Sequence, residues 1–109
     1  TNWAPFAARR RATAIRRENL RWLIILTLNN ARPIGAFEGP ILSVAQSEYP
    51  DATPLELRRE MDYLHDRQLV QVDKQPTGRW FAELTRIGVD LAEYTIPCEP
   101  GIARPAKYW

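Results

Sequence analysis

The sequence contains few of the residues on which metal sites and covalent catalysis depend. Among 109 residues there is one cysteine, Cys98, and one histidine, His65. A single cysteine excludes an internal disulfide, and these two residues leave too few ligands for a zinc site or a thiol–imidazole pair. No glycine-rich phosphate loop or nucleophile–base pair is visible either. We therefore expect no metal, no cofactor and no enzymatic activity.

Long apolar runs are also absent. The longest runs from residue 22 to 28, whereas a membrane-spanning helix needs about 20 apolar residues. Because arginines precede this run, an amphipathic helix lying on a lipid surface is an alternative, and a secretory signal is a weaker one. Within the run, however, apolar residues surround the whole helix, which indicates a helix buried in a small domain. We expect no membrane partner.

Positive charge is scarce in most of the chain and concentrated at its start. The net charge is only +2, but residues 1–32 hold seven arginines and one acid, Glu18, a charge of +6, while residues 33–109 carry −4. A helix that buries one face in the protein does not need arginines on several of its sides, so these arginines indicate a further role. We expect nucleic-acid contact there, with an acidic protein or lipid headgroups as alternatives. The candidates are Arg9, Arg10, Arg11, Arg16 and Arg17.

The first half of the chain is predicted to be helical. Residues 1–8 have no periodic pattern and are expected to form an arm. A helix should follow, from residue 7 or 9 to residue 29 or 30. The second half of this helix is expected to enter the core. A short extended stretch is expected at 32–37, then a short helix from 38–40 to 49–50 with Ile41, Val44 and Ala45 inward. Thr53-Pro54-Leu55-Glu56 is a capping box that starts a third helix, with Leu57, Met61 and Leu64 inward.

The second half is predicted to contain a β-hairpin and a last helix. Residues 69–72 and 80–84 are β-prone, and Pro76 and Gly78 between them favour a turn. Thr85 suits the cap of a helix that ends at 93 or 94, with Ile87 and Leu91 inward. Three prolines and a glycine in 96–109 favour an extended tail. The expected division is an arm (1–8), a domain (9–94) and a tail (95–109).

This order of elements predicts a mainly α protein with a small β-hairpin, a winged helix-turn-helix domain. The third helix of such a domain normally enters the major groove, and the hairpin is the wing. Residues 57–64 (LRREMDYL), Leu69-Val70 and the segment 84–88 (LTRIG) resemble the "LxxxLxxL…GLV" and "LTxxG" patterns of bacterial winged-helix regulators. Gln68 departs from that pattern, because the regulators usually have glycine there for a left-handed backbone.

A narrower resemblance covers nearly the whole chain. Residues 16–21 (RRENLR) and 101–109 (GIARPAKYW) are similar to those of short proteins of Mu-like phages and prophages, often labelled ArsR-like regulators. The resemblance implies a DNA-binding regulator of phage genes that acts in the bacterial cytoplasm. The metal sensing of ArsR proteins is not implied, because this chain lacks their cysteine pair.

The winged-helix prediction supplies a second set of candidate DNA contacts. Arg59 suits a guanine and Glu56 a cytosine, while Lys74 and Arg79 suit the DNA backbone or minor groove beside the wing. The third helix, however, has a net charge of −1, so an ordinary solvated face and a polar hairpin tip remain alternatives. The candidates are Thr53, Glu56, Arg58, Arg59, Lys74 and Arg79.

Aromatic residues at the two ends of the chain suggest a protein partner. Trp22 and Trp80 lie in apolar-periodic segments and are expected in the core, whereas the terminal aromatics have no obvious place to bury in a monomer. A homodimer is the default partner, and another phage protein is the alternative. A module for head assembly or DNA packaging is therefore the second functional hypothesis. The partner-binding candidates are Trp3, Phe6, Tyr108 and Trp109.

Overall fold

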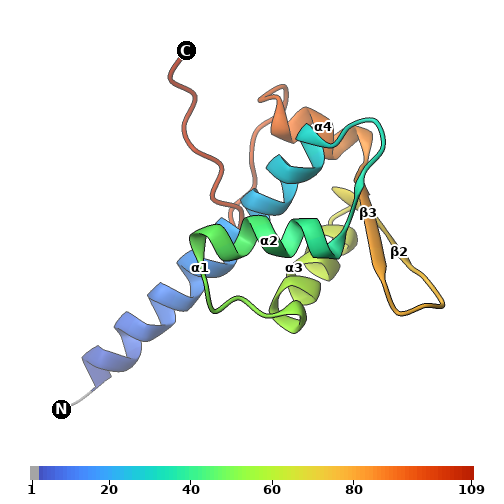
Figure 1. The fold of residues 1–109 in the computed structure, drawn as a ribbon. Coiled ribbons are helices and arrows are strands. Elements are labelled where there is room, and N and C mark those ends of the chain that lie inside the picture. Colours follow the sequence, from blue (N-terminus) through green and yellow to red (C-terminus); the bar gives the residue numbers. More distant parts are fainter. Residues whose placement is uncertain (1–2) are drawn as a thin grey trace.

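The computed structural model describes the backbone of residues 3–109 and the side chains from residue 7 onward. In these residues four helices and three strands follow one another along the chain (Figure 1). They are α1 (Trp3–Asn30), β1 (Ala36–Phe37), α2 (Glu38–Glu48), α3 (Pro54–Asp66), β2 (Val70–Lys74), β3 (Trp80–Leu84) and α4 (Arg86–Ala92).

The three strands form an antiparallel sheet in the order β1-β3-β2. Val70 pairs with Leu84 at one end of the hairpin and Lys74 with Trp80 at the other, while β1 adds two residues to the outer edge of β3. A helix, a short strand, two helices and a hairpin in this order make a winged helix. The mainly α winged-helix prediction is therefore confirmed, and the β2–β3 hairpin is the wing.

The core forms around the second half of α1. Leu20, Ile24, Ile25 and Leu28 are at most 1% exposed, and they pack with apolar side chains of α2, α3 and the sheet. Fully burying one such side chain stabilises the fold by about 1.5–3 kcal/mol. The expectation that only the second half of this helix enters the core is confirmed. No helix among the described residues is long and apolar enough to span a membrane.

Local signals in the sequence set the ends of two helices. The Thr53 hydroxyl accepts a hydrogen bond from the Glu56 N–H with Pro54 in the first turn of α3, and the Thr85 hydroxyl accepts one from the Gly88 N–H in α4. Gln68 has φ +62°, the left-handed conformation that glycine adopts most readily and that the sequence pattern predicts at this position. Both predicted caps are confirmed.

Several predictions about the helices are wrong. Helix α1 begins at Trp3, so residues 3–8 belong to it where an arm was expected, with Pro5 tolerated in its first turn. Ile87 and Val44 were expected inward but are 45% and 37% exposed, because the adjacent positions of α4 and α2 already fill the core. An ordinary solvated face was one interpretation of the third helix, but its Glu60 is only 4% exposed.

The tail after α4 folds back on the domain that precedes it. Ile102 is buried, and the Ala103 N–H donates a hydrogen bond to the Glu18 carbonyl of α1. The Arg104 guanidinium donates to the carbonyls of Leu91 and Ile96. No helix or strand follows α4, and residues up to Arg104 contact the domain that precedes them.

Candidate nucleic-acid interface

The first half of α1 extends beyond the rest of the molecule (Figure 1). We call residues 7–15 of this helix the overhang. The side chains from Ala8 to Ile15 are all exposed. Within the described part of the chain, no ion pair joins an acid to Arg9, Arg10 or Arg11, nor to Arg17 further along the helix. These four predicted DNA contacts therefore present their guanidinium groups to solvent.

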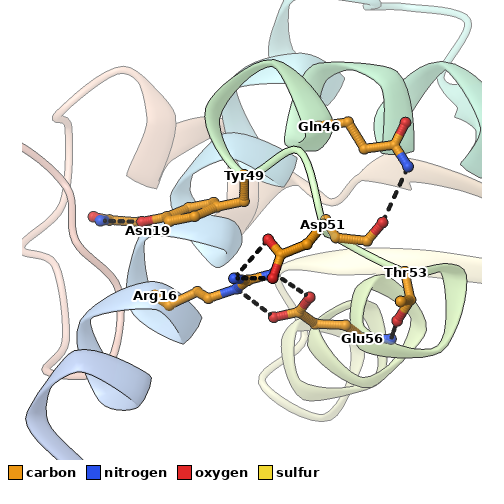
Figure 2. A network of polar contacts seen from close by, with 8 residues as sticks. Arg16, Asn19, Gln46, Tyr49, Asp51, Thr53 and Glu56 are labelled. Carbon is orange, nitrogen blue, oxygen red and sulfur yellow. Dashed lines mark hydrogen bonds and ion pairs between the residues drawn. The ribbon is translucent and has the colours of Figure 1, made fainter. Parts of the chain in front are cut away.

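Arg16, a fifth predicted contact on the same helix, is partly buried and occupied by acids of other segments (Figure 2). Its guanidinium donates two hydrogen bonds to the Glu56 carboxylate, at 2.7 and 2.8 Å, and others to Asp51. It also lies over the Tyr49 ring. The bonds to Glu56 are the main cause that raises the pKa of Arg16. Arg16 thus joins α1 to the start of α3, which leaves neither it nor Glu56 free for a base.

Arg58 of α3 is likewise occupied. It forms a bidentate ion pair with Glu38 at the start of α2, donates to the Gly78 carbonyl in the wing loop at 2.7 Å, and lies over the Trp80 ring. The hydrogen bonds that Arg58 donates to the Glu38 carboxylate are the main cause that lowers the pKa of Glu38. Arg58 therefore fixes the wing against α2 and α3.

The two wing candidates differ from each other. Lys74 pairs with Asp62 of α3 at 3.2 Å and lies over the Trp80 ring, so its charge is partly balanced. Arg79 is exposed and lies over the Phe37 ring at 3.8 Å, and no ion pair with it is found among the described side chains. Of these two wing candidates, Arg79 is the one whose charge no described acid balances through an ion pair.

On α3, Arg59 is exposed and forms no ion pair with a described side chain. Thr53 is used as the helix cap. The outward face of α3 also presents Leu55 and Asp66. A helix that carries one available cation beside acids attracts phosphate weakly, so the structure does not bring the predicted α3 contacts together as one basic surface.

Sequence reasoning missed the residues that connect α1 to α3. Arg21 donates to the Glu60 carboxylate at 2.8 Å and to the Gly101 carbonyl at 2.8 Å, and its guanidinium lies 3.5 Å from the centre of the Tyr63 ring. The spacing of charges within α3 gives no signal of the pair between Arg21 and Glu60, because these two residues are 39 positions apart in the sequence. Only the packing of α1 on α3 creates it.

The terminal aromatics fall into two groups. The side chains of Trp3 and Phe6 lie outside the described residues. The Trp109 ring packs edge-on against Tyr94, 4.7 Å between centres, yet it remains 66% exposed, and Tyr108 is 90% exposed. The domain thus offers Trp109 a partial contact that the sequence did not reveal.

Neither Cys98 nor His65 lies in a reactive cluster among the described residues. No three His, Cys, Asp or Glu side chains of that part of the chain could hold a metal ion together. Burial raises the pKa of the Cys98 thiol, which keeps the thiol protonated.

The fold and the exposed arginines define the class: a winged-helix protein with a basic helical extension. No protein-family model matches the chain, and no curated protein matches it closely. A crystal structure from Ralstonia eutropha JMP134, of a protein named a "putative DNA-binding protein", is similar, with a TM-score of 0.59 and 26% sequence identity. The similarity covers 72% of this chain and 95% of that one.

Proposed function

We propose that this protein binds double-stranded DNA and that the overhang supplies most of its affinity. The observation that carries the proposal is the group of exposed arginines at positions 9, 10 and 11, which form no ion pair with a described side chain. Successive residues of an α-helix are 100° apart, so these three side chains point in three directions. A rod with charge on several sides suits the DNA backbone, which carries a negative charge every 1.7 Å or so.

The fold and the similar structure support the same role. Winged helices commonly place their third helix and wing on DNA, and the name of the similar Ralstonia protein points the same way. In Figure 1 the overhang and the wing extend on opposite sides of α3, so both flank the element that would approach the duplex. In this proposal Arg79 is the wing residue that contacts the backbone or minor groove.

The test is the salt dependence of binding to a DNA duplex. Each neutralised phosphate contributes about −0.9 to the slope of log K against log salt concentration. The variant R9E/R10E/R11E is expected to flatten this slope by about 2.7 if each arginine contacts one phosphate. The control R86E/K107E reverses two exposed cations on α4 and the tail and should leave the slope almost unchanged. No binding by the unmodified protein at low salt would refute the proposal.

We further propose that the protein is a homodimeric regulator of phage genes that acts without a cofactor or a catalytic step. One support is the resemblance of residues 16–21 and 101–109 to proteins of Mu-like phages. The other is that winged-helix regulators commonly bind symmetric half-sites as dimers. Recovery of bound fragments from phage DNA should then enrich paired half-sites. Equal recovery of host and phage fragments would contradict a regulatory role.

A protein-interaction module in head assembly or DNA packaging is the second candidate, favoured by the exposure of Tyr108 and Trp109. Its test is the deletion of Lys107–Trp109, because a cut at Ile102 would remove a buried core residue. Loss of a phage protein partner with DNA affinity unchanged would favour this candidate. An unchanged set of partners would argue against it.

A further inference from the structure

A groove of about 560 Å³ lies between α1 and α3, and it opens to solvent. We call it the α1–α3 groove. Its walls are mostly charged: four arginines and two glutamates, with hydroxyl groups from Thr13 and Thr53 and the ring of Tyr63. Pockets for small organic ligands are mainly apolar, so this lining suits a charged, hydrated group instead.

The ion pairs in the groove leave two charges unbalanced. Glu56 is paired with Arg16 and Glu60 with Arg21, which accounts for both acids and two of the four arginines. The remaining two are Arg17 on the α1 wall and Arg59 on the α3 wall, and neither forms an ion pair with a described side chain. The residues that line the groove therefore carry a surplus of two positive charges, one on each wall, while Asp51, outside the lining, adds one negative charge beside Arg16.

The paired residues hold these walls in place. The Arg21 and Glu60 side chains are 13% and 5% exposed, and the Tyr63 ring stacks on Arg21. Arg16 fixes the outer end of the groove to Glu56 and to Asp51 in the loop before α3 (Figure 2). Because these walls are already ordered, less conformational entropy is lost when a ligand binds between them.

We propose that the α1–α3 groove binds one phosphate group of the DNA backbone, with Arg17 and Arg59 as its two ligands. This inference rests on the proposed DNA binding and assigns Arg59 a different role from the guanine contact that the sequence suggests. A guanidinium matches the geometry of phosphate oxygens, and two of them from different helices fix the position of the duplex relative to α1 and α3.

The experiment measures the affinity and salt slope of R17Q, R59Q and R17Q/R59Q on duplexes of several sequences. Each single variant should weaken binding about tenfold and equally on every sequence, since a hydrogen bond between charged groups is lost. Because both arginines serve one phosphate, the double variant should flatten the slope by about 0.9 in total. R17K retains the charge and should retain most of the slope.

Three results would overturn the inference while leaving the proposed function intact. Unchanged affinity and slope in R17Q/R59Q, with R9E/R10E/R11E still impaired, would show that the groove does not meet DNA and would make an acidic protein segment its candidate ligand. A change of base preference in R59Q would make Arg59 a base contact. A flattening near 1.8 in the double variant would mean two separate phosphates.

Failure of the unmodified protein to bind DNA is a distinct outcome, because it removes the proposed function and this inference together. R86Q, which removes one exposed cation of α4, is the matched control, and its slope should equal that of the unmodified protein. Thermal unfolding of each variant verifies that the fold is kept; Arg17 and Arg59 are exposed, so no loss of stability is expected.

Discussion

The overhang of α1 and the body of the domain use the same residue type in opposite ways. In the body, Arg16, Arg21 and Arg58 each hold an acid from another element. In the overhang, Arg9, Arg10 and Arg11 pair with no acid of the described chain. The body arginines therefore stabilise the packing of helices, and the overhang arginines remain available to an outside anion.

This difference teaches that formal charge along a sequence does not measure available charge. Residues 1–32 carry +6, but two of their arginines are neutralised by acids of α3. The same pairing removes Glu56 and Glu60 from the acidic total of α3. Around α1, α3 and the wing, the described cations that pair with no acid are those of the overhang, the two arginines of the groove and Arg79.

The largest effect should come from breaking the most buried pair of the body. Glu60→Ala leaves the Arg21 guanidinium, only 13% exposed, without its carboxylate. Removing one partner of a buried ion pair costs about 3 kcal/mol, which urea-induced unfolding would measure. Glu48→Ala, at an exposed position of α2, should change stability by less than about 0.5 kcal/mol. Equal losses in both variants would contradict the importance of the pair.

A smaller effect is expected at Glu38, and it depends on pH. Hydrogen bonds from Arg58 lower the pKa of Glu38, so its contribution is present above the ordinary carboxyl pKa, about 4.3, and is lost as pH falls through the lowered value. Glu38→Gln should cost about 1.5 kcal/mol at pH 7.

The measurement is the free energy of unfolding of both proteins from pH 7 to pH 3. The difference between the unmodified protein and E38Q should shrink below the ordinary carboxyl pKa. A difference that is constant with pH would mean that the Glu38 charge does not stabilise the fold.

The smallest effect on stability is expected in the overhang. R9Q, R10Q and R11Q remove exposed charges without breaking an ion pair of the described chain, so each should change the unfolding free energy by less than about 0.5 kcal/mol. The same variants should weaken DNA binding. Thermal unfolding and binding measured on the same samples separate the two effects, and a large loss of stability in R10Q would remove the distinction between overhang and body.

Most of the fold could be predicted from the sequence because its signals are local. The capping box at Thr53, the apolar spacing of Leu57, Met61 and Leu64, and the turn at Pro76 and Gly78 each act over a few residues. Together they place the helices and the wing in the right order.

The candidate interface could be predicted only in part, because ion pairs between helices have no local signature. Arg58 and Arg59 are adjacent in the sequence, yet one is bound to Glu38 and the other is available. Which of them faces α2 and which faces the α1–α3 groove follows from how α3 packs, and that is a tertiary property.

The unbroken course of α1 has a consequence for the length of DNA that one copy could cover. Twenty-eight helical residues span about 42 Å, and the longest dimension of the molecule is 51 Å. At 3.4 Å per base pair, the 51 Å length of the molecule equals about 15 base pairs, roughly one and a half turns of the duplex. A nuclease-protection footprint near that length would come from a single copy, whereas a symmetric pair would protect about twice as much.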